Sequence, residues 1–140
     1  MKIVLDTNVL SELMKPQGLT KVKNWVAAQP RENLFTTSIT QAEILYGIAI
    51  LPDGKRSQAL REAAQRMFVE DFSSQIISFE QTAAICFAEI AANRKKIGKP
   101  IAQADAQIAA ICLANNALIA TRNVDDFVDC QIEIFNPWDL

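Results

Sequence analysis

The stretch Lys2-Ile3-Val4-Leu5-Asp6-Thr7-Asn8 is the most informative part of the chain about its architecture. Its apolar residues are typical of a short buried strand, and that strand ends on a carboxylate followed by two small polar side chains. In open α/β sheets, ligands bind outside the carboxyl ends of the strands. The stretch therefore predicts that Asp6 lies at the edge of the sheet where such proteins keep their chemistry.

Short apolar runs alternate with helical patterns along the rest of the chain. We expect further strands at 34–37, 76–78, 117–121 and 131–135, and helices at 9–14, 19–28, 39–51, 55–72, 80–96 and 102–113. This alternation favours a mostly parallel sheet with helices on both faces. A length of 140 residues suits one domain, so we predict a single α/β domain over residues 1–140.

Local sequence marks two helix ends. Ser38 is followed three residues later by Gln41, which is a capping-box pattern, so we expect a helix to begin there. The helix over 80–96 ends in basic residues and is followed by Gly98 and Pro100. That order of dipole-complementing charge, glycine and proline is typical of a helix C-terminus.

The composition is that of a soluble globular protein, with 50% hydrophobic and 21% charged residues. Fourteen Lys and Arg against sixteen Asp and Glu give a net charge of -2, so the chain as a whole does not attract nucleic acid. Any such binding must be local. The clusters that could provide it are Lys55-Arg56 with Arg61, Arg94-Lys95-Lys96 with Lys99, and Arg122, and solvated helix ends are the alternative for each.

Cysteine usage and hydropathy predict a cytoplasmic protein. Cys86, Cys112 and Cys130 are widely spaced in apolar segments, as reduced and buried thiols are. The first apolar run is too short for a signal peptide, and the longest apolar region, 101–120, is interrupted by polar residues. We therefore expect no contact with a membrane.

Each acid that stands out has an ordinary explanation when it is taken alone. Asp6 precedes a helix and would be a good N-cap. Glu43 shares an otherwise apolar helix side with Ile39, from whose edge it could extend to solvent. Asp105 lies early in its helix, where the dipole favours negative charge, and Asp126 would be a solvated loop acid.

Taken together, these acids favour a metal site. The polar run that contains Asn123 and Asp126 follows a later strand, whose carboxyl end should share an edge with Asp6. Glu43 and Asp105 could face that edge from their helices. Three carboxylates about 5 Å apart would repel by about 3 kcal/mol per pair at an effective dielectric near 20. Such a cluster takes up protons or binds a cation, and oxygen ligands without His or Cys suit Mg²⁺ or Mn²⁺.

The combined motifs resemble the PIN-domain ribonucleases, and among them the VapC-type and FitB-type toxins of type II toxin–antitoxin pairs. The matching segments are IVLDTN, TTSITQAEILYGI around Glu43, IAQADAQIAA around Asp105, ATRNVDDF and the closing FNPW. The resemblance implies a PIN-like domain in which Asp6, Glu43 and Asp105 bind Mg²⁺ or Mn²⁺. Thr7 and Thr121 would orient water or the carboxylates.

One position departs from the FitB-type pattern. The fourth acid of those proteins stands where this chain has Asn123. Either Asp126, three residues later, supplies the missing charge, or the site uses three acids and an amide.

The resemblance implies metal-dependent hydrolysis of RNA phosphodiester bonds. Asp6, Glu43 and Asp105 would carry it, together with Asp126 or Asn123. Because the nucleophile would be water and not the ribose hydroxyl, the products would carry 5′-phosphate and 3′-hydroxyl ends.

The resemblance also implies protein partners. A small antitoxin would occupy a groove on the chain and bind operator DNA through its own N-terminal domain, and we expect the chain to form a homodimer. Apolar residues of the first two helices could line this groove, with core packing as their alternative role: Leu10, Leu13, Met14, Trp25 and Val26.

Two rival functions stay open. A catalytically weak partner in a DNA-bound repressor complex would agree with Asn123 in place of an acid. A phosphoaspartyl enzyme would use Asp6 as its nucleophile, but the haloacid-dehalogenase type would require an aspartate where Asn8 stands. Metal titration, together with nuclease assays of Asp6→Asn, would separate a catalytic metal site from both.

Overall fold

The sheet consists of five parallel strands in the order β3-β2-β1-β4-β5. The computed structural model describes residues 1–140. The strands are β1 (Lys2–Leu5), β2 (Leu34–Thr37), β3 (Ile76–Ile77), β4 (Ala117–Ala120) and β5 (Ile134–Phe135). The expected parallel sheet is therefore confirmed. Its two outer strands are shorter than predicted, with two residues each.

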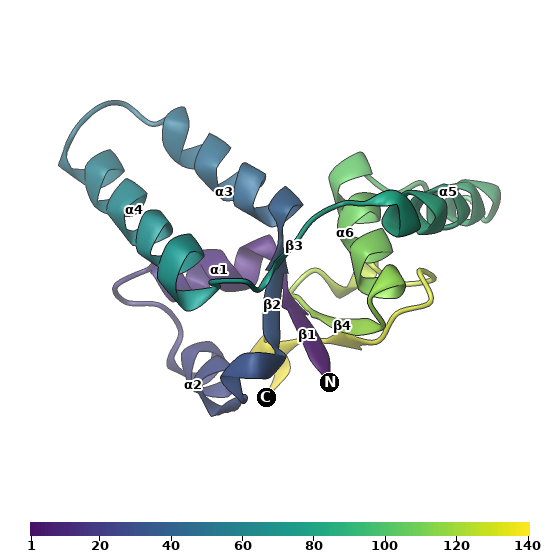
Figure 1. Ribbon diagram of the computed structural model, residues 1–140, viewed down its shortest axis with the longest axis horizontal. Helices are drawn as coiled ribbons and strands as arrows, with labels where there is room; N and C mark the ends of the chain where they lie inside the picture. Colours follow the sequence, from purple (N-terminus) through teal and green to yellow (C-terminus); the bar gives the residue numbers. More distant parts are fainter.

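Helices cover both faces of this sheet, as predicted. They are α1 (Thr7–Met14), α2 (Thr20–Ala28), α3 (Ser38–Ala49), α4 (Lys55–Arg66), α5 (Gln81–Lys96) and α6 (Gln103–Ala114). Figure 1 shows α1 to α4 on one side and α5 and α6 on the other. The central strand β1 packs against helices on both faces, because Ile3 and Leu5 belong to one hydrophobic cluster and Val4 to the other.

The register of β1 and β4 brings two distant chain segments to one edge. Lys2 pairs with Ala117 and Leu5 with Ala120, so both strands end at the same level. The Asp6 N–H then donates to the Ala120 carbonyl at 3.0 Å. The residues that follow β1 and β4 therefore start side by side.

The capping residue of α3 is Thr37 and not Ser38. The Thr40 N–H donates to Thr37 Oγ1 at 3.1 Å, while Ser38 is already the first helical residue. The reason is conformational: Thr37 ends β2 with an extended backbone, which an N-cap requires. The end of a strand and the cap of the next helix are thus the same residue.

The long helix predicted over 55–72 is divided. Regular α-helix ends at Arg66, and a π-helical turn, Met67–Asp71, continues it. The predicted end of α5 is confirmed, since Gly98 has a φ of +78° and its N–H donates to the Lys95 carbonyl at 3.1 Å. None of the helices has both the length and the apolarity needed to cross a membrane.

Candidate functional site

Asp6 is the buried centre of the candidate site. It is 4% exposed, and its Oδ2 accepts hydrogen bonds from Thr121 Oγ1 at 2.8 Å and from Asn8 Nδ2 at 3.3 Å. Asp6 does occupy the N-cap position of α1, but its side chain makes no capping hydrogen bond. The predicted N-cap position is therefore confirmed, but the carboxylate does not cap the helix and is instead oriented by the end of β4.

Asn8 joins the ends of β1 and β4, a role that sequence reasoning missed. Its Nδ2 donates to Thr121 Oγ1 at 3.2 Å, and its Oδ1 accepts from the Arg122 N–H at 3.1 Å. Thr121 Oγ1 also accepts from the Asn123 N–H at 3.0 Å. The amide two residues after Asp6 was the available signal, because an amide can donate and accept at once: Asn8 donates to Asp6 and Thr121 and accepts from Arg122.

Thr7 orients Glu43 across the gap between α1 and α3. Its Oγ1 donates to Glu43 Oε1 at 2.7 Å and lies 3.2 Å from Thr40 Oγ1. Glu43 itself is exposed, and so are Tyr46 (67%) and Ile50 (64%) on the same helix side. The apolar side on which the sequence places Glu43 is therefore a surface. The carboxylate reaches the site without being buried.

The pKa values show that four carboxylates share one electrostatic field. Burial, and to a lesser extent the charges of Asp126, Asp6 and Glu43, raises the pKa of Asp105 to about 6, while Arg94 opposes the rise. Burial also raises the pKa of Asp6, against the hydrogen bond from the end of β4, and Glu43 and Asp126 add to the rise. The structure thus brings the predicted acids to one region.

The donor chemistry of this region fits a hard divalent cation. It consists of carboxylates, hydroxyls and one amide, and the chain contains no histidine. As they stand, no three acidic side chains are grouped closely enough to hold one metal ion. Glu43 and Asp126 are exposed, so their side chains have room to change rotamer when a cation binds.

Asn123 and Asp126 occupy different positions relative to the other acids. Asn123 begins the turn after β4, and its main chain is fixed by Thr121. Asp126 lies in the short 3-10 helix Val124–Asp126, and its charge acts on the pKa of both Asp6 and Asp105. Of the two, Asp126 is therefore the one whose charge reaches the other acids.

Residues 3–130 match the family profile of the PIN domain. The chain belongs to the PIN-domain family. Among similar proteins, Toxin FitB from Neisseria gonorrhoeae is 35% identical over 136 residues, which cover 97% of this chain and 98% of that protein. VapC ribonuclease Y4jK from Sinorhizobium fredii is 36% identical and covers 98% of both chains. A chain in the structure of FitAB bound to an IR36 DNA fragment superposes with a TM-score of 0.92 at 36% identity, over 99% of this chain and 96% of that one.

This PIN domain has a groove between α1, α2 and α4, which supply half of its lining residues. Its volume is about 750 Å³. Of the five groove residues that the sequence suggested, Leu13, Met14 and Val26 line it. The prediction is wrong for the other two. Leu10 is fully buried, and Trp25 stacks on Phe135 with the ring centres 4.8 Å apart and does not line the groove.

The rim of this groove is basic. Lys15, Lys23, Arg31 and Arg66 contribute to its lining, against one acid, Asp71. An apolar floor with cations around it suits an amphipathic segment that carries negative charge.

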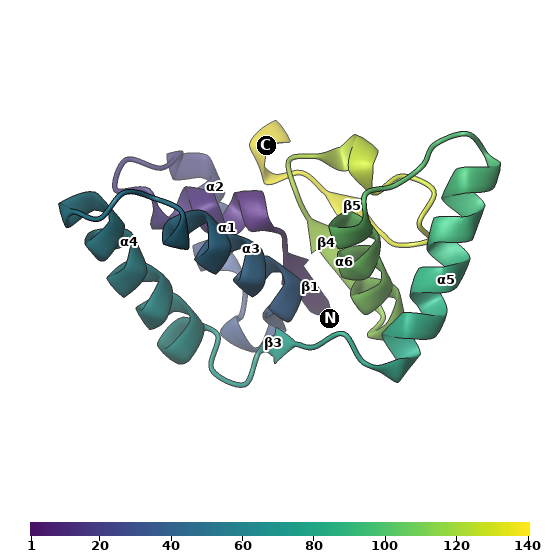
Figure 2. The same cartoon turned by 90° about the horizontal axis from the view of Figure 1, so that it is seen from above.

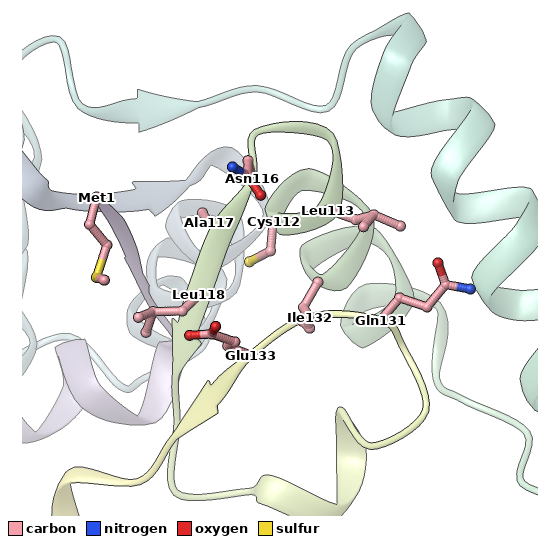
Figure 3. Close-up of a pocket in the computed structure, with 9 residues that line it drawn as sticks. All are labelled: Met1, Cys112, Leu113, Asn116, Ala117, Leu118, Gln131, Ile132 and Glu133. Atoms are coloured by element: carbon pink, nitrogen blue, oxygen red, sulfur yellow. The ribbon is translucent and has the colours of Figure 1, made fainter.

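A second hollow of about 450 Å³ lies at the opposite end of the sheet. Figure 3 shows Met1, Cys112 and Glu133 among its lining residues, next to the first residues of β4. Burial raises the pKa of the Cys112 thiol, which therefore stays protonated and unreactive. This hollow is separate from the acids at the carboxyl edge.

The basic clusters differ in accessibility. Lys95, Lys96 and Lys99 are exposed, but Arg94 is buried, so the prediction that Arg94 belongs to a surface cluster is wrong. Arg122 is exposed beside the acids, with its guanidinium 5.5 Å from the centre of the Trp138 ring.

Proposed function

We propose that this PIN domain is a toxin ribonuclease that hydrolyses RNA phosphodiester bonds with Mg²⁺ or Mn²⁺. The observation that carries the proposal is the group of four carboxylates at the carboxyl edge of the sheet, where burial and the charges of the other three acids raise the pKa of Asp105 to about 6. Such repulsion is relieved by a bound cation. The names of two relatives, a toxin and a VapC ribonuclease, agree with this chemistry.

Asp6, Glu43 and Asp105 would hold the cation, with Asp126 as the fourth acid. The buried Asp6 offers a fixed carboxylate, because Thr121 and Asn8 hold its orientation. When bound, the cation would lower the pKa of a water molecule and offset the charge that grows on the phosphate oxygens.

The protein's own groups prepare this site in two ways. Thr7 restricts the exposed Glu43 through a hydrogen bond of 2.7 Å, so less side-chain freedom is lost when a ligand binds. Asp105 retains a proton to higher pH than an ordinary aspartate, and a cation would compete with that proton. Metal affinity should therefore increase as the pH rises through about 6 and level off above neutrality.

Analysis of the RNA ends tests the reaction. Purified protein with Mn²⁺ should produce 5′-phosphate and 3′-hydroxyl ends, and Asp6→Asn should abolish cleavage. Asp53→Asn, in the exposed loop before α4, is a matched control that should cleave like the wild type. Products with 2′,3′-cyclic phosphates would refute hydrolysis by water. A protein that neither binds Mn²⁺ nor cleaves RNA would favour the alternative, a catalytically weak partner in a repressor complex.

The proposal includes an antitoxin that controls the enzyme. The groove between α1, α2 and α4 would receive an acidic amphipathic segment of that antitoxin, since its rim is basic and its floor apolar. The DNA in the FitAB structure agrees with operator binding through the antitoxin. Leu45 and Tyr46 of α3, and Ile50 directly after it, are exposed hydrophobic side chains that a homodimer interface would bury.

A further inference from the structure

Arg94 is one of two charged residues that the fold buries, the other being Asp6. It lies in the last turn of α5 and is 5% exposed. No carboxylate pairs with it, since the two ion pairs of the structure are Lys15 with Glu12 and Lys99 with Asp129. A buried cation without a paired anion is costly, and a solvated helix end would not require one. Its burial therefore indicates a specific role.

The guanidinium of Arg94 connects two separate segments through hydrogen bonds. Its Nε donates to the Lys99 carbonyl at 2.7 Å, in the turn that ends α5. Its Nη1 lies 3.0 Å from the carbonyls of Asp126 and Val128 and 3.6 Å from Cys130 Sγ, all in the loop after β4. Figure 2 shows this loop running alongside α5. Only the planar fork of an arginine offers donors in several fixed directions at once.

The loop that Arg94 holds is conformationally demanding. Asp129 and Gln131 have φ angles of 60° and 62°, in the left-handed region that side chains with a Cβ disfavour. Such backbone persists only where its surroundings determine it. Phe127 fixes the loop from the core side, where it is 1% exposed. Arg94 supplies the polar contacts from the helix side.

The same hydrogen bonds bear on the candidate site. The segment from Asn123 to Asp126 is held at one end, where the Asn123 N–H donates to Thr121 Oγ1 at 3.0 Å. At the other end, the Asp126 carbonyl accepts from Arg94 at 3.0 Å. Between these two contacts the chain forms the 3-10 helix Val124–Asp126. The position of the Asp126 side chain is set by the backbone that Arg94 holds.

We infer that Arg94 is a positioning residue, which fixes the Asp126 carboxylate at the metal site through the Asp126 main-chain carbonyl. The inference rests on the proposed function, because it assigns Asp126 to that site. Arg94 itself touches neither metal nor RNA in this arrangement. It acts by keeping the loop in one conformation.

Two measurements on the full chain test this role: hydrogen exchange without metal and calorimetric titration with Mn²⁺ alone. In Arg94→Gln and Arg94→Lys, amides of residues 124–130 should exchange faster, while those of β1 and α6 stay as in the wild type. The Mn²⁺ affinity should fall about 10- to 100-fold, as for other residues that orient metal ligands. Lys95→Gln, at the exposed neighbouring position, should change neither quantity.

A double-mutant cycle separates positioning from general damage to the fold. If Arg94 acts through Asp126, Arg94→Gln should weaken Mn²⁺ binding in the wild type but have no further effect in the Asp126→Asn background. Equal losses in both backgrounds, or unchanged loop exchange in both Arg94 variants, would overturn the inference. Faster exchange throughout β1 and α6 in both variants would also overturn it, since Arg94 would then serve the whole fold. Wild-type protein that binds no Mn²⁺ would instead refute the metal site itself, and the positioning role with it.

Discussion

Thr121 Oγ1 donates to Asp6 Oδ2 at 2.8 Å and so joins two residues that are 115 positions apart in the chain. Both side chains are buried, and each follows a strand of the same parallel pair. The hydrogen bond fixes the one carboxylate of the site that the fold buries, and it lowers the pKa that burial raises.

Thr121→Val should therefore destabilise the protein while keeping its shape. The substitution leaves the buried Asp6 carboxylate without its shortest hydrogen bond, which costs about 1–3 kcal/mol. Urea unfolding at pH 7 measures this loss. Thr82→Val is the matched control, since Thr82 is exposed on α5. Equal unfolding midpoints for the two variants would contradict a structural role for the hydroxyl.

The closeness of Asp6 and Thr121 at the edge of the sheet could be predicted from the sequence, because it follows from the order of strands and helices along the chain. Asp6 and Thr121 each stand directly after an apolar run, and parallel strands end at one edge. The side-chain functions of Asn8 and Arg94 could not be predicted in this way. Their partners are mainly a distant hydroxyl and main-chain groups of loops, and loops leave no periodic pattern in the sequence.

The sequence predicts only in part which apolar residues of the helices are buried in the core. The groove residues Leu13 and Met14 and the core residue Leu10 have the same apolar character, and only the packing of α2 and α4 against α1 separates them. On α3, the apolar side with Tyr46 and Ile50 faces solvent, since the core accepts Ile44 and Ile48 instead.

The raised pKa of Asp105 predicts a pH dependence of stability in the metal-free protein. A raised pKa means that the folded state binds the proton more tightly than the unfolded state. The resulting stabilisation is complete below about pH 4 and is lost as the pH rises through about 6. Asp105→Asn should remove this loss and raise the free energy of unfolding by about 1 kcal/mol at pH 7.5. The full pKa shift would correspond to a larger value, but solvent screens the half-exposed side chain.

Unfolding in denaturant with EDTA at pH 4 and pH 7.5 measures this effect. Asp125→Asn, at an exposed position of the same acidic region, should shift stability little at either pH. The same change in stability at both pH values in Asp105→Asn would show that charge repulsion is not its cause.

Arg66→Glu should weaken antitoxin binding without changing RNA cleavage. Arg66 lines the groove between α1, α2 and α4, and reversing its charge places two acids together if the partner segment is acidic. We expect a loss of at least about tenfold in affinity, equal to about 1.4 kcal/mol, by titration with the cognate antitoxin. Arg56→Glu, exposed at the start of the same helix and outside the groove, is the control. Equal affinities for the two variants would argue against this groove.

Gly18→Ala should destabilise the turn between α1 and α2. A Cβ at Gly18 would collide with the Glu12 carbonyl oxygen and come within 2.7 Å of Lys23 Cε. Relieving such a clash costs about 1–3 kcal/mol. Gly47→Ala should have the opposite sign, about 0.5–1 kcal/mol more stable, since nothing lies within 4 Å and the position is helical. Thermal unfolding of both variants measures the two effects, and equal shifts in Tm would contradict a steric clash at Gly18.

The parallel pairing of β1 with β4 also sets an order of events during synthesis. The ribosome makes Asp6 long before Ala117–Ala120, the strand whose end orients the Asp6 carboxylate. Pairings of such high sequence separation form late. A nascent or prematurely terminated chain that lacks β4 therefore contains Asp6 but not the hydroxyl that holds it, so the candidate site assembles only after β4 has been made.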